Sequence, residues 1–515
     1  MATEWRRNMQ IKMLEGEYWW AGAVSHGHKM PFNEKSDSDA SMLKGTQFCG
    51  CDQFAPVMVS SKGRYFWSDK PFEITVKDGI IEIEGEGGQL YEGFENLKGA
   101  YLAACRAHFP FDGRLPDSDF FTHPQYNTWI ELGIDQFQDR IIKYAEEIVA
   151  NGFKPGILMI DGGWQEEYGV YEFFNMRKVP EPKKMVDRLH ELGFKVMLWV
   201  SPIVPGAGWR FKELRSKGYL VKDAENKTAF RTWWSGISPV MDLSNPDCFK
   251  WYTDLLNSDM ENYGVDGFKF DAGDGYMYRD DDITYGNVLG REQTMMYNLF
   301  GEQYPLNEFR AAWKCGGHPI VARLQDKNHR WKDGAFDCLI PHTIIQGLAG
   351  YAYCCPDMVG GGMISTIGDD KPMDEELFVR WAQANALMGM MQMSIAPWRV
   401  LSEDSYRIVK DAIDLHERFG PLFYELAVHA SKTGEPIVRH MAYEFPDEGF
   451  EACNDMFMLG SNYLVAPVVE QGAREKVVKL PAGAKWINDR GQEFDGGQTV
   501  VEDAPLDRLV YYKKI

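Results

Sequence analysis

The sequence has few cysteines for its 515 residues and no long run of apolar residues. Its nine cysteines are an odd number spread over a large chain, unlike the dense frameworks of disulfide-stabilised secreted proteins. We expect them to be mostly reduced and buried. The sequence shows neither an apolar segment after its N-terminal charges nor a stretch that approaches a membrane span. We therefore expect no signal peptide, no membrane segment and a cytoplasmic location.

Positive charge is also scarce. The chain has 55 Lys and Arg residues against 76 Asp and Glu residues, which gives a formal net charge of −21. A surface this acidic repels phosphate backbones and anionic lipids, so we expect neither nucleic-acid nor membrane partners. The charge favours a neutral ligand over an anionic one, although a local basic pocket could reverse this preference.

One cysteine pattern raises the question of a metal site. His26 and His28 lie two residues apart, as do Cys49 and Cys51, and the four together could ligate zinc. Structural zinc ligands are usually separated by at least two residues, and alternate residues of a strand share a face without any metal. The spacing therefore favours ordinary strand residues over a zinc site.

Aromatic residues, in contrast, are abundant. The chain contains 16 Trp and 24 Tyr. Surplus aromatic rings often line sites for flat, partly apolar ligands such as sugar faces, although large β-rich enzymes carry many aromatic residues in any case. The composition is compatible with a sugar site but does not decide the question.

The length predicts two or three domains. Residues 1–122 lack helical periodicity, and the segment 71–84 has the strand, Asp-Gly turn, strand pattern of a hairpin. The helical period is absent again from 426–515, where turn-bounded apolar runs occur at 463–468 and 476–480. We predict an N-terminal β-sandwich and a C-terminal β-domain on either side of a central domain.

The central residues, 123–425, alternate between strand-like and helix-like segments. Some strand-like runs, such as 196–200, are apolar throughout, as is typical of strands buried on both faces. One helix is expected to begin at Asn245–Pro246 and another to be capped by Asp135. Eight strands are the number in an α/β fold of the (β/α)8 TIM-barrel type. The predicted strands are 128–132, 157–161, 195–201, 267–271, 308–313, 336–341, 351–355 and 392–396.

Functional residues of such barrels lie at the carboxyl ends of the strands. The residues there are carboxylates, tryptophans and single cations, which together are typical of a carbohydrate site. No His/Cys ligand set and no glycine-rich phosphate loop is among them, so we expect neither a metal nor a cofactor. The candidates are Trp129, Glu131, Asp161, Trp164, Trp199, Lys269, Asp271, Arg310, Asp357, Trp398 and Arg399.

Hydrolysis of a glycoside needs two carboxyl groups in opposite protonation states. Lys269 and Asp271 are two residues apart on one predicted strand, so both side chains point to the same face. An ammonium group near a carboxylate favours the ionised form that a nucleophile requires. A structural ion pair at the end of the strand is the alternative.

The string Gly-Phe-Lys-Phe-Asp-Ala-Gly-Asp at 267–274 resembles the nucleophile strand of glycoside hydrolase family 31. The resemblance makes Asp271 the nucleophile. Arg310 begins a segment similar to one in which the family's acid/base aspartate follows an arginine at a fixed interval. Asp326, sixteen residues after Arg310, is therefore implied as the acid/base, although Gln-Asp-Lys replaces the family's Gly-Asp-Asn. Asp274 is a rival carboxylate that we rank below Asp326.

The similarity extends over most of the chain. Segments 434–439, 457–467 and 480–489 resemble the family's β-domain, and 18–31 resembles a loop that some members bring to the mouth of the active site. Ordinary packing at the barrel mouth is the alternative role for each tryptophan. The substrate contacts that the resemblance and the strand-end rule imply are Asp161, Trp164, Trp199, Trp234, Lys269, Arg310 and Trp398.

The segment after the eighth strand departs from the α-glucosidase pattern. Ala-Pro-Trp-Arg-Val at 396–400 replaces an Arg-x-His motif whose histidine would hold the equatorial hydroxyls of glucose. This region and Asp-Ala-Gly-Asp are most similar to the myogenesis-regulating glycosidase branch of the family, whose activity is on α-galactosides. The resemblance thus implies a retaining, exo-acting α-galactosidase that takes an oligosaccharide or another α-glycoside.

Several alternatives stay open. An α-glucosidase, an α-xylosidase or a sulfoquinovosidase would use the same machinery, and a catalytically inactive sugar-binding barrel is the alternative without enzyme activity. The presence of Lys269, Asp271, Arg310 and Asp326 together argues against the inactive barrel, because a binding module does not need an acid/base pair. A homo-oligomer is compatible with the sequence.

Overall fold

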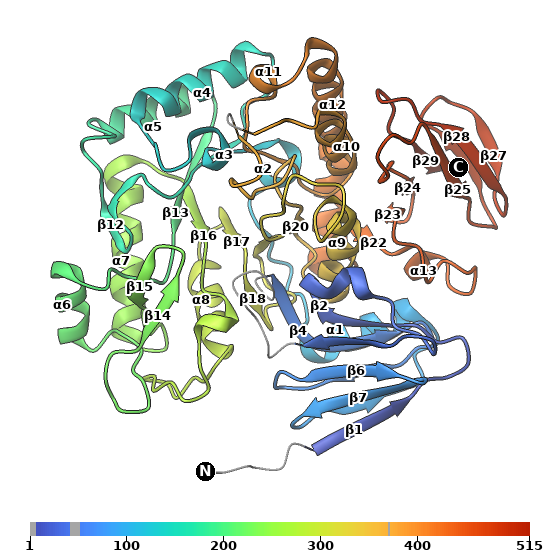
Figure 1. Cartoon of the computed structure of the whole chain (residues 1–515), viewed down its shortest axis with the longest axis horizontal. Helices are drawn as coiled ribbons and strands as arrows, with labels where there is room; N and C mark the ends of the chain where they lie inside the picture. Colours follow the sequence, from blue (N-terminus) through green and yellow to red (C-terminus); the bar gives the residue numbers. More distant parts are fainter. Residues whose placement is uncertain (1–6, 42–51, 369–370) are drawn as a thin grey trace.

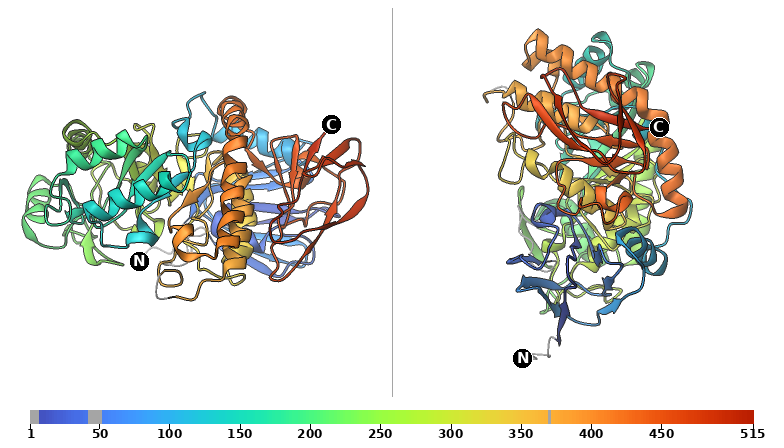
Figure 2. Two further views of the ribbon diagram at one scale, coloured as in Figure 1. Left: turned by 90° about the horizontal axis from the view of Figure 1, so that it is seen from above. Right: turned by 90° about the vertical axis from the view of Figure 1, so that its right-hand side faces the viewer.

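The computed structural model describes residues 7–41, 52–368 and 371–515 of the chain (Figure 1). N-terminal and C-terminal strands flank a central barrel. The long helix α12 (Glu403–Thr433) stands between the barrel and the C-terminal strands, as the view from above shows (Figure 2). The predicted α/β fold class, a barrel with β-structure on both sides, is confirmed. The exact domain boundaries stay a prediction.

The N-terminal region contains two sheets. The first has the order β1 (Arg7–Lys12), β7 (Ile80–Gly85), β6 (Glu73–Lys77), β3 (Ser38–Ser41). Its β6–β7 hairpin is the predicted one, and Asp78 and Gly79 at the turn both have positive φ, as a tight hairpin turn requires. The second sheet contains β2 (Trp19–Ala23), β4 (Gln53–Ser60), β5 (Tyr65–Trp67), β8 (Gln89–Tyr91) and β18 (Ala312–Trp313).

Strand β18 connects this region to the barrel. It belongs to the central part of the chain but pairs in parallel with β4, so that Ala312 lies opposite Gln53. The side-chain amide of Gln53 also donates to the carbonyl groups of Arg310 and Arg323, at 2.6 and 2.8 Å. The N-terminal sheet therefore contacts the residue that follows one barrel strand and the last residue of another.

The barrel is one sheet of eight parallel strands. Going around it, the strands follow the chain order, and the last strand pairs with the first. Residues 157–160 and 196–200 are buried on both faces, which explains their continuous apolar sequence. The strands are β9 (Gln125–Asn127), β10 (Ile157–Ile160), β13 (Lys195–Val200), β16 (Gly267–Phe270), β17 (Asn307–Phe309), β19 (Val321–Arg323), β20 (Cys354–Cys355) and β21 (Gln392–Met393).

Two of the predicted strands were wrong. The first barrel strand ends at Asn127, whose side chain accepts from the backbone N–H of Trp129, and 129–132 forms the short helix α3 (Trp129–Leu132). Residues 336–341 form η3 (Phe336–Cys338) and the start of α9 (Leu339–Leu348). Every residue of α9 is buried, so its apolar sequence looks like that of a buried strand.

Helices cover the outside of the barrel. The predicted start at Asn245 is confirmed, since its side chain accepts from the backbone N–H of Asp247. Asp135 does not cap the next helix, which begins at Gln138. The remaining helices are α1 (Leu97–His108), α2 (Asp119–Thr122), α4 (Gln138–Ala150), α5 (Pro182–Glu191), α6 (Gly208–Lys217), α7 (Pro246–Tyr263), α8 (Glu292–Gly301), α10 (Glu375–Ala386) and α11 (Pro397–Val400).

Two small hairpins extend from the barrel on the side of the strand ends. They are β11 (Gln165–Glu167) with β12 (Val170–Phe174), and β14 (Phe230–Trp233) with β15 (Gly236–Pro239). The turn of the second hairpin carries Trp234. A short helix, η2 (Gly275–Met277), follows the end of β16.

The C-terminal region is built from antiparallel strands, as predicted. The run 463–468 contains β24 and the run 476–480 contains most of β25. Of the described helices, none is long and apolar enough to cross a bilayer. The elements are β22 (Val438–Arg439), α13 (Met441–Glu444), β23 (Phe457–Leu459), β24 (Tyr463–Val465), β25 (Glu475–Lys479), β26 (Lys485–Asn488), β27 (Glu493–Asp495), β28 (Thr499–Asp503) and β29 (Tyr511–Lys514).

Candidate active site

A cavity of about 750 Å³ opens at the carboxyl ends of the barrel strands. Residues at or just after the ends of β10, β13, β16, β17 and β19 line it, as the barrel fold requires of a functional site. Its mixed wall of carboxylates, cations and aromatic rings is typical of a site for a small polar ligand. The predicted site residues in this wall are Asp161, Trp199, Trp234, Lys269, Asp271, Arg310 and Asp326.

Asp271 directly follows β16 and lies at the centre of a hydrogen-bond network. Its Oδ1 accepts from Arg310 Nε and from the backbone N–H of Ala272, both at 2.8 Å. Its Oδ2 accepts from the indole N–H of Trp199, also at 2.8 Å. Burial alone would raise the pKa of Asp271, but the charges of Arg310, Lys269 and Arg323 lower it below its ordinary value. The carboxylate is therefore ionised and held in one orientation.

The direct cation partner of Asp271 is Arg310 and not Lys269, which corrects the sequence argument. Lys269 forms its ion pair with Asp161, with 2.6 Å between Nζ and Oδ2. Burial would lower the pKa of Lys269, but the charge of Asp161 raises it, so the ammonium group stays charged. Lys269 acts on Asp271 only as a second, more distant positive charge.

Asp274, the rival carboxylate, lies behind this network. It is fully buried, is not among the residues that line the cavity, and accepts from Arg310 Nη2 at 2.7 Å. Burial, together with the charge of Asp271, raises the pKa of Asp274 to about 6. Asp274 therefore orients the guanidinium group of Arg310 and does not itself reach the cavity.

Asp326 lies in the loop after β19, and its side chain is 30% exposed. Its Oδ1 accepts from Arg323 Nη1 at 2.9 Å, and the same Nη1 donates to Asp357 at 3.2 Å. Burial and the neighbouring charge of Asp326 raise the pKa of Asp357 to about 7. Asp326 and Asp357 therefore share one guanidinium group of Arg323.

Sequence reasoning does not single out Asp357 beyond its place after the seventh strand. The structure gives it a clear role in positioning, because it accepts from the backbone N–H groups of Lys327, Met358 and Gly362 at 2.6, 2.8 and 2.9 Å. It thus joins the loop that carries Asp326 to the loop that follows β20.

Two of the four predicted tryptophans line the cavity. Trp199 also contacts the ring of Tyr168, another lining residue, with 5.2 Å between ring centroids. Trp234 lies 5.5 Å from the guanidinium carbon of Arg310, a cation–π contact. Both rings can cover a sugar face.

The structure does not bring Trp164 or Trp398 to the cavity wall. Trp164 is fully buried and donates to the carbonyl of Trp199 at 2.9 Å, so it supports that residue from behind. Trp398 begins the short helix α11 with Pro397 and packs against Tyr144 and Phe153. The strand-end rule locates both residues correctly along the chain but does not give the direction of their side chains.

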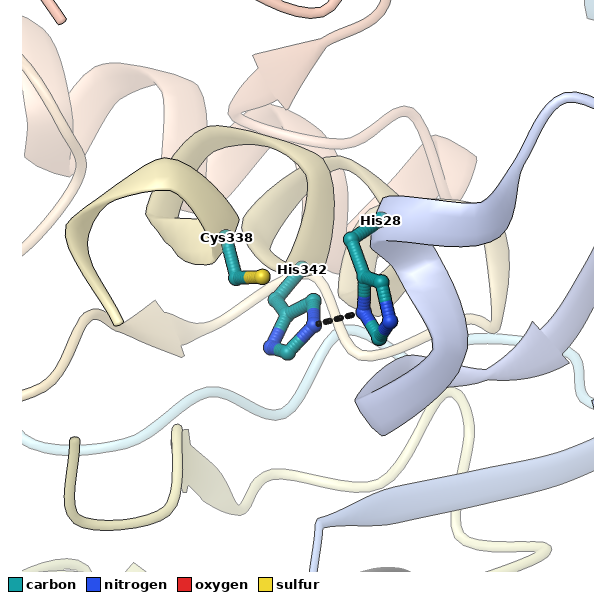
Figure 3. A group of neighbouring side chains, drawn as sticks. All are labelled: His28, Cys338 and His342. Atoms are coloured by element: carbon teal, nitrogen blue, oxygen red, sulfur yellow. Dashed lines mark hydrogen bonds between the residues drawn. The ribbon is translucent and has the colours of Figure 1, made fainter. Parts of the chain in front are cut away.

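The N-terminal segment reaches the cavity, as the resemblance implied for residues 18–31. The short helix η1 (Val24–Lys29) contributes Ser25, His26, His28 and Lys29 to the wall. His28 faces His342 of α9, with 3.3 Å between Nδ1 and Nε2, and the sulfur of Cys338 lies beside them (Figure 3). The zinc hypothesis also involved Cys49 and Cys51, which lie outside the described residues.

Comparison with known proteins identifies the family. Residues 124–426 match the TIM-barrel domain of glycosyl hydrolases family 31, and residues 434–514 match the C-terminal domain of the same family. The chain belongs to glycoside hydrolase family 31. Myogenesis-regulating glycosidase of Mus musculus is 33% identical to it over 79% of the chain and 58% of the mouse protein.

Other family 31 relatives differ in the activities that their names give. Alpha-glucosidase 2 of Bacillus thermoamyloliquefaciens is 25% identical over 73% of this chain, and an alpha-xylosidase of Emericella nidulans is 26% identical over 71% of it. The match covers 50% of each of these relatives, so the chain spans about half the length of the curated relatives it matches.

Solved structures confirm the fold. A family 31 dextranase of Flavobacterium johnsoniae, complexed with glucose, superimposes with a TM-score of 0.84 over 98% of this chain and 66% of the dextranase, at 22% identity. An alpha-xylosidase from a soil metagenome, complexed with xylose, superimposes with a TM-score of 0.81 over 98% of this chain and 79% of its own, at 20% identity.

Proposed function

We propose that this member of family 31 is a retaining, exo-acting α-galactosidase. The observation that carries the proposal is the presence of two different carboxyl groups in one cavity. Arg310 keeps Asp271 ionised, as a nucleophile must be, while Asp326, whose side chain is 30% exposed, lies in the wall of the same cavity as the candidate acid/base. Glycosidic bond cleavage with retention requires two such carboxyl groups, one to attack the anomeric carbon and one to protonate the leaving oxygen.

In the first step, Asp326 donates its proton to the leaving glycosidic oxygen while Asp271 attacks the anomeric carbon. The product is a covalent glycosyl-enzyme and a free aglycone. Asp326, now ionised, removes a proton from water, which attacks the anomeric carbon and releases the sugar with its original α-configuration.

Several groups hold the sugar in this mechanism. Asp161 and Lys269 form a buried ion pair in the cavity wall and present carboxylate and ammonium hydrogen-bonding groups to hydroxyls. Trp199 and Trp234 cover the apolar faces of the ring. The indole N–H of Trp199 also orients the nucleophile, so this residue links sugar binding to attack.

The preference for galactose rests on the segment after the eighth strand. No residue of 392–400 lines the cavity, so nothing from this segment takes the place of the histidine that suits the equatorial hydroxyls of glucose. Galactose differs from glucose in its axial 4-hydroxyl group. That axial group leaves a larger apolar face on the other side of the ring, where tryptophan rings can pack.

The substrate test measures initial rates on p-nitrophenyl α-glycosides of galactose, glucose, xylose, N-acetylgalactosamine and sulfoquinovose. We expect the highest kcat/KM for the galactoside and an α-anomer as the first product in proton NMR. Preference for another sugar would overturn the galactose assignment and keep the mechanism. Sugar binding without turnover of any substrate would support the inactive barrel.

The nucleophile test uses Asp271→Ala. We expect turnover to fall by at least 10⁴-fold, as is usual when a catalytic group is removed. Asp281→Ala is the matched control, because Asp281 is exposed and lies outside the cavity. Retention of activity in Asp271→Ala would contradict the assignment.

The acid/base test uses Asp326→Ala with an activated aryl galactoside. We expect azide to restore the rate and to form α-galactosyl azide, because the small anion replaces the water that Asp326 would otherwise activate. If azide does not restore the rate and the variant shows no initial burst of nitrophenol, the acid/base role belongs to another residue.

A further inference from the structure

One wall of the cavity is formed by three linked basic side chains. Lys327 Nζ lies 3.0 Å from Nδ1 of His342, and Nε2 of His342 lies 3.3 Å from Nδ1 of His28. Figure 3 shows His28 and His342 facing each other from the N-terminal segment and from α9. All three residues line the cavity, and Lys327 directly follows Asp326 in the chain.

The direction of these hydrogen bonds follows from their chemistry. An ammonium group only donates, so Nδ1 of His342 accepts from Lys327. Burial, followed by the charge of Lys327, lowers the pKa of His342 well below its ordinary value, so the ring is neutral and carries its hydrogen on Nε2. That N–H donates to His28 Nδ1. Burial also lowers the pKa of His28, so its ring is neutral and carries its hydrogen on Nε2. The wall therefore offers two donors to a ligand, Lys327 Nζ and His28 Nε2.

The charge of Lys327 has no carboxylate partner among the described residues. Its side chain is almost fully buried, and no ion pair joins it to a described Asp or Glu. The nearby carboxyl groups have other partners: Asp326 and Asp357 accept from Arg323, and Asp52 accepts from the backbone N–H of Gln325 at 2.6 Å. Burial raises the pKa of Asp52 and of Asp357, which weakens both as counter-ions.

A buried ammonium group that points into a cavity is stabilised by a negatively charged ligand. Neutral sugar hydroxyls both donate and accept, whereas an oxyanion only accepts and therefore suits a wall of donors. Two further polar atoms of this wall, Ser25 Oγ and His26 Nδ1, are buried and have no hydrogen-bond partner.

We propose that the wall of Lys327, His342 and His28 is a subsite for an oxyanion on the aglycone, so that the preferred substrate is an α-glycoside with an acidic leaving group. The position on the aglycone side follows from the chain, since Lys327 is next to the residue that protonates the leaving oxygen. This inference rests on the proposed glycosidase function. It names a carboxylate, sulfate or phosphate group as the shared chemistry.

Zinc is the alternative ligand for the same histidines. The 3.3 Å between the two ring nitrogens equals the separation of two ligands around a tetrahedral zinc ion. Zinc on Nε2 of His342 would, however, require a hydrogen on Nδ1, where Lys327 can only donate. The third donor, Cys338, is buried, and burial raises the pKa of its thiol to about 12, so a zinc ion would have to displace the thiol proton.

The substrate experiment compares α-galactosyl-(1→4)-glucose with α-galactosyl-(1→4)-glucuronate, which differ only at C6 of the aglycone. Matched 6-sulfate and 6-phosphate compounds distinguish the oxyanions. We expect kcat/KM to be about tenfold higher for the best anionic form, and the preference to decrease as salt is added. Equal or lower values for all anionic forms would overturn the proposal while galactose release would still support the glycosidase.

Direct binding separates the two proposals completely. Titration calorimetry of the wild-type protein with free glucuronate and free glucose needs no turnover and no particular glycone. We expect glucuronate to bind about tenfold more tightly, by the same charge-assisted hydrogen bonds. Equal affinities would refute the oxyanion subsite even if every glycoside of the panel were inactive.

Variants assign the effect to the wall. In Lys327→Met the preference ratio should fall to about one, whereas Lys332→Met should keep it, because Lys332 is exposed and pairs with Glu470. A ratio unchanged by Lys327→Met would overturn the role of Lys327. One equivalent of zinc in the purified protein, lost in Cys338→Ser, would replace the oxyanion subsite with a metal site. The wild-type comparisons are decisive even if a variant fails to fold.

Discussion

Arg310 is the residue whose removal tests the electrostatic argument most directly. Its Nε donates to Asp271 and its Nη2 donates to Asp274, at 2.8 and 2.7 Å, so one guanidinium group bridges two carboxyl groups. In Arg310→Met this bridge is lost. Lys269 and Arg323 remain near Asp271, but neither of them forms a direct ion pair with it.

The size of the effect can be estimated from the contact. An arginine in direct contact typically lowers the pKa of an aspartate by about one to three units, which corresponds to roughly 1.4 to 4 kcal/mol. Arg310 also lowers the pKa of Asp274, which is already about 6, so Asp274 becomes more fully protonated at neutral pH without it. We therefore expect the pKa of Asp271 to rise by about one to two units in the variant.

The assay is the pH dependence of kcat/KM, whose acidic limb reports ionisation of the nucleophile in the free enzyme. In the wild type the apparent pKa of this limb should lie below the ordinary pKa range of an aspartate, and in Arg310→Met the limb should move to higher pH. Arg310→Lys is the matched control, because it keeps the charge while it loses the two-carboxylate bridge, and its limb should move less. Equal acidic limbs in wild type and Arg310→Met would refute the reasoning, whatever the loss in absolute rate.

Further predictions concern stability and the tryptophans. Asp259 is buried, neither of its oxygens has a hydrogen-bond partner, and burial raises its pKa to about 8. Its contribution to the free energy of unfolding therefore decreases as the pH rises from about 4 to 8. Thermal unfolding should show that Asp259→Asn stabilises the protein more at pH 8 than at pH 5; an equal gain at both would contradict the buried charge. Trp199→Phe removes the hydrogen bond to Asp271 Oδ2 and should lower kcat about tenfold or more. Trp398→Phe should lower Tm and leave kcat/KM within about twofold, because Trp398 packs outside the cavity.

The barrel could be predicted because its buried strands have a distinctive sequence. The runs at 157–160 and 196–200 are apolar on both faces, which is rare among other elements of this length. The same signal failed at 336–341, because the start of α9 is equally apolar and equally buried. The true sixth strand, β19, has only three residues, too few for a periodic pattern to develop.

The candidate site was predictable where position along the chain decides it. Asp161, Asp271 and Asp326 follow strand ends, and all three line the cavity. Side-chain direction was not predictable: Trp398 is close to a strand end, but a helical turn directs its ring outward. Asp357 has no motif that marks it, and its role depends on the distance to Arg323, which is 34 residues earlier in the chain.

The sequence by itself determined the kind of fold and the residues able to perform the chemistry, because periodicity and strand-end position are local properties. Only the tertiary structure decided which charged side chains form ion pairs with one another. Lys269 lies two residues from Asp271 but pairs with Asp161, while Arg310 reaches Asp271 from the neighbouring strand. The reason is geometric: closure of the barrel brings residues from separate strands within 3 Å, and pairwise contacts at that distance set the protonation states.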